Sequence, residues 1–375
     1  MVAGWHAFGV LQPQGWHVAV YDTARVLFNG HAAVTLFFVL SGLVLGLSFN
    51  RADTPLGTRY AHFALRRVFR ICPAFWVAVL LIAGAVVWLD APREYPAGVS
   101  AWFAGHWREP VTGPLVLRNL LFLDRQLNPP SWTLRAELVC SFVLPLLALI
   151  SSRASRRGQI LALLALMTTS ALGSGNLNKW LIMFYLGVWI PTAGRWFFQR
   201  LQAVPGVARW TAPVAWLALL TGQSWYGPHP AWGDLIEGAT AATFISAVLY
   251  GPGLRWFRVL DWPLARFYGR VSYSFYLYNM VSLYFVAKLA MRLCPVSRMV
   301  DHAVVSAAGL LLVSVLLTTL LAALSYRLVE RPSIGSSKRL CALLTPNRSR
   351  PWWRKFCPRS KSAPQPAVSG GCKCD

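Results

Sequence analysis

Two ionisable side chains stand inside otherwise apolar stretches, which makes them candidates for catalysis. His6 lies in the stretch 1–11, and a neutral imidazole can act as a general base near physiological pH. Glu137 lies in the stretch 132–150, where a carboxylate surrounded by apolar residues is a functional-site hypothesis by default. Structural alternatives stay open for both: an isolated histidine near the chain end, and one half of an ion pair.

A group of arginines precedes another apolar stretch, 72–89. Arg67 and Arg70 are three residues apart and share one face of a helix, with Arg66 adjacent. Guanidinium groups bind phosphate oxygens in bidentate fashion, so these three residues are candidates for holding a phosphorylated donor such as an acyl-coenzyme A. The alternative is that they only mark the cytoplasmic side of the membrane.

Two further charged positions require partners. Arg135 is two residues from Glu137, so the two side chains do not face each other on a helix, and we expect each to meet a partner from another helix. Glu330 is placed to pair with Arg327, three residues earlier, and Pro332 is expected to end that helix. Alternatively, Glu330 helps to place the cytoplasmic arginines.

The elements that carry these residues are predicted to be membrane helices. The chain has 375 residues, of which 56% are apolar and only 13% charged, about half the charged share of an ordinary soluble domain. A membrane span needs about 20 mostly apolar residues. Nine stretches approach or meet this requirement: 31–49, 72–89, 132–150, 158–175, 180–194, 210–226, 235–251, 271–287 and 302–326.

The sequence therefore predicts an all-α polytopic transmembrane bundle with its C-terminus in the cytoplasm. Lys and Arg concentrate in alternate segments between the spans, and the richest of them begins at residue 327. The stretch 1–11 is too short to span and resembles the last part of a truncated first helix, so we expect ten spans in a full-length form. The transmembrane domain is predicted over 1–332.

Residues 333–375 are predicted to form a basic, disordered cytoplasmic tail attracted to anionic lipid. A net charge of +23 could indicate binding to nucleic acid. However, long charge-free runs and a total of 18 Trp and 20 Phe indicate a lipid environment, so no nucleic-acid partner is expected. The cysteine pattern predicts no metal site. Ser41 and Gly42 predict a close helix crossing.

Taken in order, five stretches resemble motifs of the membrane acyltransferase 3 family, which comprises bacterial O-acyltransferases of surface polysaccharides and related acceptors. Trp132 lies in the third of these stretches, and Tyr276 in the fourth. The resemblance extends from residue 1 to about residue 340. The matching stretches are 30–42, 66–73, 131–137, 269–278 and 330–332.

The resemblance implies the fold and the roles of the site residues. The family has ten spans, and its proposed catalytic histidine corresponds to His6. Its arginine motif corresponds to Arg67 and Arg70, and its fourth-helix glutamate to Glu137, which would orient His6 or the acceptor. The family often has histidine at the end of its ninth-span motif, where this chain has Asn279.

The activity implied by the resemblance is transfer of an acyl group, by default acetyl, from acyl-coenzyme A to a hydroxyl of a saccharide or another cell-envelope acceptor. The donor is a substrate, and no permanently bound cofactor is expected. The resemblance implies the bacterial inner membrane, a carbohydrate or lipid-linked acceptor, membrane lipid, and envelope-polysaccharide assembly proteins as partners. Two alternatives remain: a transporter of acylated saccharide, and an inactive, N-terminally truncated family member.

Overall fold

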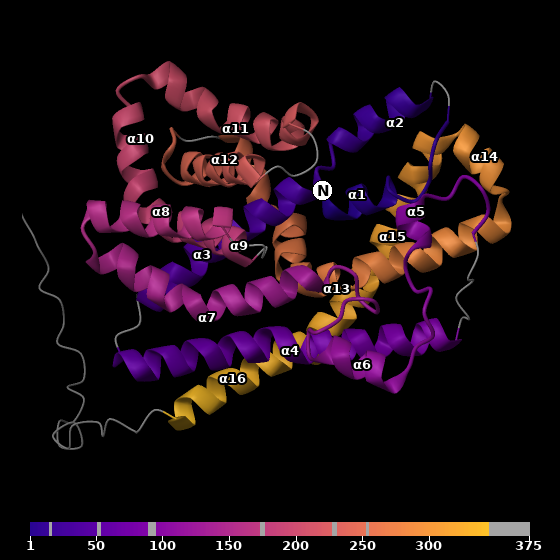
Figure 1. Ribbon diagram of the computed structural model, residues 1–375, viewed down its shortest axis with the longest axis horizontal. Helices are drawn as coiled ribbons and strands as arrows, with labels where there is room; N and C mark the ends of the chain where they lie inside the picture. Colours follow the sequence, from indigo (N-terminus) through magenta and orange to yellow (C-terminus); the bar gives the residue numbers. More distant parts are fainter. Residues whose placement is uncertain are drawn as a thin grey trace, which may run out of the picture.

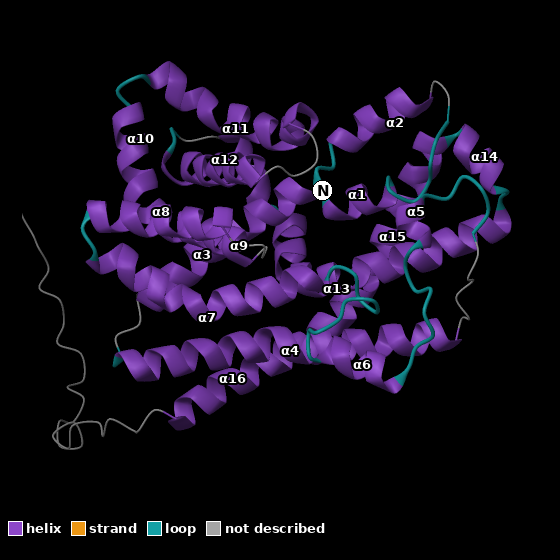
Figure 2. Ribbon diagram, in the orientation of Figure 1, coloured by secondary structure: helices purple, strands orange, loops and turns teal. Residues whose placement is uncertain are grey.

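The computed structural model describes residues 1–14, 17–50, 54–88, 95–172, 177–226, 231–252 and 255–344. Over these residues the chain is helical, and its only β-type pairing is an isolated bridge between Leu11 and Val99. Figure 2 accordingly shows helices joined by loops, without a strand in the described part. The predicted all-α class is confirmed.

The helices differ widely in length, and the longest ones run side by side through the bundle (Figure 1). In chain order they are α1 (Val2–Ala7), α2 (His17–Val26), α3 (Gly30–Asn50), α4 (Leu56–Trp88), α5 (Ala101–Ala104), α6 (Gly113–Leu120), α7 (Ser131–Arg153), α8 (Arg156–Leu172), α9 (Leu177–Trp189), η1 (Ile190–Gly194), α10 (Arg195–Leu201), α11 (Pro205–Tyr226), α12 (Ala231–Tyr250), η2 (Arg255–Asp261), α13 (Pro263–Leu293), α14 (Val296–Asp301), α15 (Ala303–Ser325), η3 (Tyr326–Glu330) and α16 (Arg331–Leu344).

Within the described residues, five helical segments are long and apolar enough to cross a membrane. Each of the nine predicted spans falls wholly or partly on a helix, but the count of nine spans plus a truncated helix is not confirmed. In the stretch 1–11, the helix is confined to the six residues of α1. The five segments are Val18–Asn50, Leu56–Trp88, Ser131–Arg153, Leu177–Leu201 and Ala303–Leu344.

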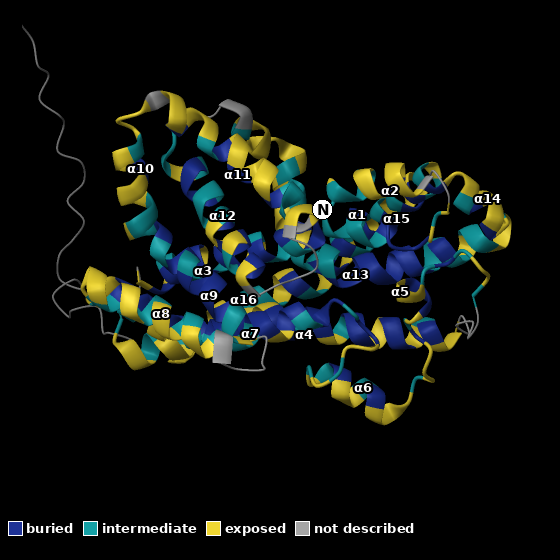
Figure 3. Cartoon of the chain, turned by 45° about the horizontal axis from the view of Figure 1, so that its top comes forward, coloured by how far each residue is buried: buried dark blue, intermediate teal, exposed yellow. Residues whose placement is uncertain are grey.

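Two apolar clusters form the interior. One joins the end of α1 to α4, α13 and α15, with Phe75 and Leu283 fully buried or nearly so, and the other joins α3, α7, α9 and α12. Buried residues gather on α4, α9 and α13, whereas the outer faces of α8 and α11 carry many exposed ones (Figure 3). Helix α1 contacts α3, α13 and α15, so it lies between the two clusters.

Helices α3 and α9 cross at very short range. A Cβ at Gly42 would overlap the carbonyl oxygen of Phe184, and a Cβ at Gly187 would overlap that of Val39. Small residues allow helix backbones to approach in this way inside membranes. The crossing predicted from Ser41 and Gly42 is confirmed, with the half-buried Ser41 beside the contact.

This contact makes a prediction about stability. Gly42→Ala should destabilise the protein by about 1–3 kcal/mol, because the helix backbones must move apart to admit the new methyl group. Gly84→Ala in α4 is the matched control, since a Cβ there meets nothing within 4 Å and alanine favours a helix. Thermal denaturation in detergent measures both, and equal midpoints for the two variants would show that the crossing is not tight.

The last helix does not end at Pro332, which corrects the predicted helix end. The chain continues from α15 through the π-helix η3 into α16, which ends at Leu344. Pro332 directly follows the wider turn of the π-helix η3, the kind of local irregularity at which a continuous helix accommodates a proline. Residues 333–344 of the predicted disordered tail are therefore helical, and residues 345–375 lie outside the described part.

Candidate active site

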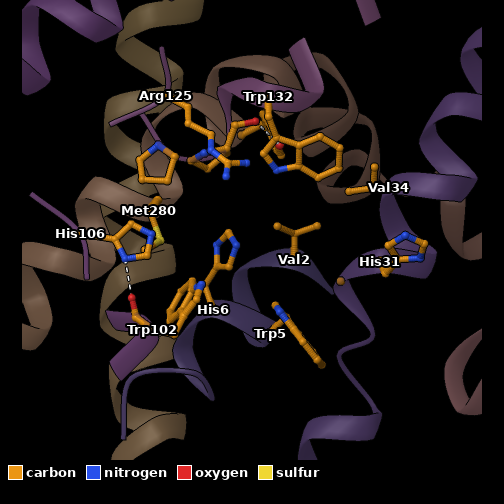
Figure 4. A pocket seen from close by; sticks show the side chains of 14 residues that line it. Val2, Trp5, His6, His31, Val34, Trp102, His106, Arg125, Trp132 and Met280 are labelled. Carbon is orange, nitrogen blue, oxygen red and sulfur yellow. Dashed lines mark hydrogen bonds between the residues drawn. The ribbon is translucent and has the colours of Figure 1, made fainter. Parts of the chain in front are cut away.

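His6 lines a cavity of about 450 Å³, which we call the histidine cavity. Its imidazole stacks on Trp102, with ring centroids 5.5 Å apart. Figure 4 shows the ring of His6 pointing into the open space between α1 and the side chains opposite. The wall consists of Val2, Trp5, His6, Gly30, His31, Val34, Trp102, His106, Arg125, Pro129, Pro130, Trp132, Tyr276 and Met280.

Asn279 of α13 holds the imidazole through its other nitrogen. The Nδ1 of His6 lies 3.0 Å from the Oδ1 of Asn279. The Nδ2 of Asn279 donates to the carbonyl of Tyr276 at 2.6 Å, which fixes the orientation of the amide. Because an amide oxygen only accepts, Nδ1 of His6 must carry the proton, and Nε2 keeps a free lone pair. The arrangement leaves Nε2 as the basic atom of the ring.

A second cavity, of about 240 Å³, adjoins the first, and we call it the arginine cavity. Its wall includes Arg70, Glu137 and Tyr273. The hydroxyl of one shared wall residue, Tyr276, donates to the carbonyl of Pro130 at 2.9 Å and lies 2.6 Å from the hydroxyl of Thr133. Three residues line both cavities: Val2, Val34 and Tyr276.

Glu137 forms a buried ion pair with Arg67, between α7 and α4. The expectation that Glu137 meets a partner from another helix is confirmed. It does not hydrogen-bond His6 in the structure, and Asn279 provides that contact instead. Of the two orienting roles expected of Glu137, the one toward the acceptor therefore stays a prediction, because the carboxylate faces the arginine helix rather than His6.

Arg70 and Glu330 meet across α4 and η3. Glu330 is buried, accepts a hydrogen bond from Ser274 at 2.9 Å and lies 3.8 Å from the Nη1 of Arg70. The expected pair of Glu330 with Arg327 is replaced by this one, which agrees with the alternative that Glu330 places an arginine. The side chain of Arg70 remains 44% exposed, so part of its guanidinium is available to a ligand.

Of the remaining predicted site residues, some line the histidine cavity and others lie outside both cavities. Trp132 lines the histidine cavity and packs on Trp180, with ring centroids 5.4 Å apart.

Arg66 is exposed and lines neither cavity. Arg135 is also exposed, and no ion pair of Arg135 is found within the described residues, so its expected partner from another helix is not observed. On α7, two residues from Glu137, it points away from the bundle. Ser41 lies at the crossing of α3 and α9, outside both cavities.

Sequence reasoning missed a charged cluster beside the histidine cavity. His31 places Nδ1 2.5 Å from Glu237 and Nε2 3.4 Å from Asp234, and Lys179 lies 3.1 Å from Asp234. Thr35 donates to Glu237 at 3.0 Å. The ligand atoms of His31, Asp234 and Glu237 lie within 4.8 Å of one another, a spacing that would suit a metal ion. With the ammonium of Lys179 already on Asp234, the cluster forms a closed charge network that fixes this wall of the cavity.

The fold and site define a helical membrane protein with a histidine-containing cavity inside its bundle. A family model described as an acyltransferase domain matches residues 1–327, so the chain belongs to the acyltransferase 3 family. The resemblance seen in the sequence motifs is thereby confirmed.

The chain also matches part of one curated protein. The chain is 26% identical over 153 residues to the "Regulator of hypoxia-inducible factor 1" of Caenorhabditis elegans. The match covers 39% of this chain and 29% of that protein, so the chain spans less than a third of that relative's length. No solved structure matches the chain.

Proposed function

We propose that the protein transfers an acyl group, by default acetyl, from cytosolic acyl-coenzyme A to a hydroxyl of a saccharide or another cell-envelope acceptor. The observation that carries this proposal is the shared wall of the two cavities: one holds a base and the other holds an exposed arginine. A donor anchored at the arginine cavity can therefore present its thioester to a base in the next cavity.

The donor would lie on the arginine side. Arg70 is half-exposed and lines the arginine cavity, and Arg66 is exposed nearby on α4. In this proposal the guanidinium of Arg70, with that of Arg66 four residues earlier on the same helix, binds the phosphates of coenzyme A. Arg67 is buried against Glu137, and in this proposal the pair shapes the cavity wall while Glu330 holds Arg70 in position.

The reaction follows from the state of His6. Nε2 accepts the proton of the acceptor hydroxyl as its oxygen attacks the thioester carbonyl carbon. The tetrahedral intermediate then breaks its carbon–sulfur bond, and the imidazolium returns the proton to the departing thiolate. The products are an ester and free coenzyme A, and His6 ends in its original state. A base positioned in this way contributes about 10²- to 10⁴-fold in rate.

The histidine cavity suits a sugar ring. Its wall combines the indole rings of Trp5, Trp102 and Trp132 with polar groups that include His106 and Arg125. Such a wall offers broad apolar faces for packing and a few polar groups for orientation. In this proposal, as the resemblance of the sequence motifs implies, the protein lies in the bacterial inner membrane with a cytoplasmic C-terminus, beside proteins of envelope-polysaccharide assembly.

The proposal is tested with purified protein in detergent, acetyl-coenzyme A labelled in the acetyl group, and a panel of saccharide acceptors. We expect the label to appear in the sugar and an equal amount of free thiol to be released. The main alternative, a saccharide transporter, is measured in liposomes loaded with acylated sugar. Sugar flux without any label transfer would contradict the proposed activity and favour transport.

A further inference from the structure

Arg125 lies in the loop between α6 and α7 and lines the histidine cavity. In Figure 4 its guanidinium and the ring of His6 enter the cavity from opposite sides. Arg125 is exposed, so an incoming molecule can reach it. Arg125 has no role in the proposed reaction.

No carboxylate among the described residues faces the guanidinium of Arg125 across the cavity. In this part of the chain, neither an aspartate nor a glutamate lines the cavity. The neighbouring carboxylate of Asp124 is engaged elsewhere, because one oxygen lies 3.6 Å from Arg118 and the other accepts from the backbone N–H groups of Arg125 and Gln126. Arg125 therefore presents an uncompensated positive charge to whatever occupies the cavity.

The histidines of the cavity do not supply a comparable charge. Burial lowers the pKa of His106 below its ordinary value, so this ring is neutral near pH 7. His31 lies against the carboxylates of Asp234 and Glu237, which balance any charge it carries. The permanent cation of the wall is thus Arg125, opposite the proposed base.

We infer that Arg125 binds an anionic group on the acceptor, so that the preferred acceptors are acidic saccharides. A guanidinium forms paired, charge-assisted hydrogen bonds with a carboxylate or a phosphate, and the indole rings of the same cavity pack on the sugar. The donor's phosphates are assigned to the arginine cavity, which leaves Arg125 for the acceptor. This inference rests on the proposed function, because it names the substrate class of the same site.

The test compares wild-type protein with Arg125→Ala and Arg125→Lys. Arg298→Ala is the control, since Arg298 of α14 is exposed and lines neither cavity. Three acceptors separate the charge sources: methyl glucoside is neutral, methyl glucuronide carries a carboxylate, and glucose 6-phosphate carries a phosphate. Binding of each is followed by tryptophan fluorescence, because three tryptophans line the cavity, and acetyl transfer is measured in parallel.

We expect wild-type protein and Arg298→Ala to bind at least one acidic sugar more tightly than methyl glucoside. Arg125→Ala should weaken acidic-sugar binding on the order of 10- to 100-fold and leave methyl glucoside unchanged, with Arg125→Lys in between. The sugar that loses affinity identifies the anionic group. The inference is overturned if wild-type protein does not prefer either acidic sugar, or if Arg125→Ala binds all three sugars as wild type does.

The two readouts also separate this inference from the proposed function. Charge-selective binding without acetyl transfer would contradict the proposed activity but support the inference that Arg125 binds an anionic group. Transfer that falls equally for all three sugars in Arg125→Ala, with unchanged binding, would mean that Arg125 stabilises the transition state instead, and the inference would be wrong.

Discussion

Replacement of His6 by alanine is expected to reduce acyl transfer by about 10²- to 10⁴-fold, the contribution typical of a positioned base. The imidazole points into the histidine cavity and keeps a free lone pair on Nε2, because Nδ1 donates to Asn279. The loss should fall on kcat, since the donor is held by residues of the adjoining cavity. Initial rates of labelled acetyl transfer at saturating donor measure this effect.

His302→Ala is the matched control for this experiment, because His302 is exposed and lines neither cavity. It should transfer at the wild-type rate. If His6→Ala and His302→Ala were equally active, the base would have to be a different group.

The partner of His6 extends the same prediction. Asn279→Leu removes the acceptor oxygen and should lower kcat by about 10- to 100-fold, because Nδ1 then has no fixed partner and the ring loses its orientation. Asn279→Asp keeps an acceptor oxygen at the same place and should retain more activity than Asn279→Leu. A merely structural role for Asn279 would instead lower the folded yield of both variants without separating their kcat values.

Arg67→Met is expected to destabilise the protein by about 3–5 kcal/mol, because it leaves the buried carboxylate of Glu137 without its ion-pair partner. The cost arises from the unpaired charge rather than from lost packing, since methionine fills a similar volume. Unfolding of the purified protein by denaturant in detergent measures the change in free energy.

The double variant tests this explanation. Arg67→Met with Glu137→Leu removes both charges, and replacement of a whole buried pair by apolar residues is often neutral or stabilising. We expect it to recover most of the stability lost in the single variant. Additive losses would show that the two side chains do not act as a pair. Donor affinity of the double variant then separates a structural pair from a phosphate-binding role of Arg67.

Spacing along the chain predicted which residues need partners, and packing decided which partners they meet. Arg67 and Arg70 share a face of α4 as their spacing predicts, and each meets a carboxylate. The sequence could not show that Glu137 lies against Arg67, since that pair depends on how α4 and α7 pack. The same holds for Glu330, which pairs with Arg70 of a helix about 260 residues earlier in the chain.

Two groups of site residues differ in how far the sequence alone could predict their contacts. Asp234 and Glu237 are three residues apart on one helical face, so their joint role could have been predicted, but their partner His31 lies more than 200 residues away. The sequence could not show that Asn279 contacts His6, because that hydrogen bond depends on the packing of α1 against α13. The helix end predicted at Pro332 was wrong because the sequence did not show the π-helix that precedes this proline in a continuous helix.

In the proposed function, the thioester of a donor held at the arginine cavity reaches His6 past the residues that line both cavities, and the variant Val34→Trp probes this route. Val34 lines both cavities, so the larger ring should block the route of the thioester to His6. Val305→Trp, at an exposed position on α15, controls for the added ring. Labelled acetyl transfer should fall at least about 100-fold in Val34→Trp, the loss expected when reacting groups no longer meet, while Val305→Trp stays at the wild-type rate. Wild-type transfer by Val34→Trp would contradict the account.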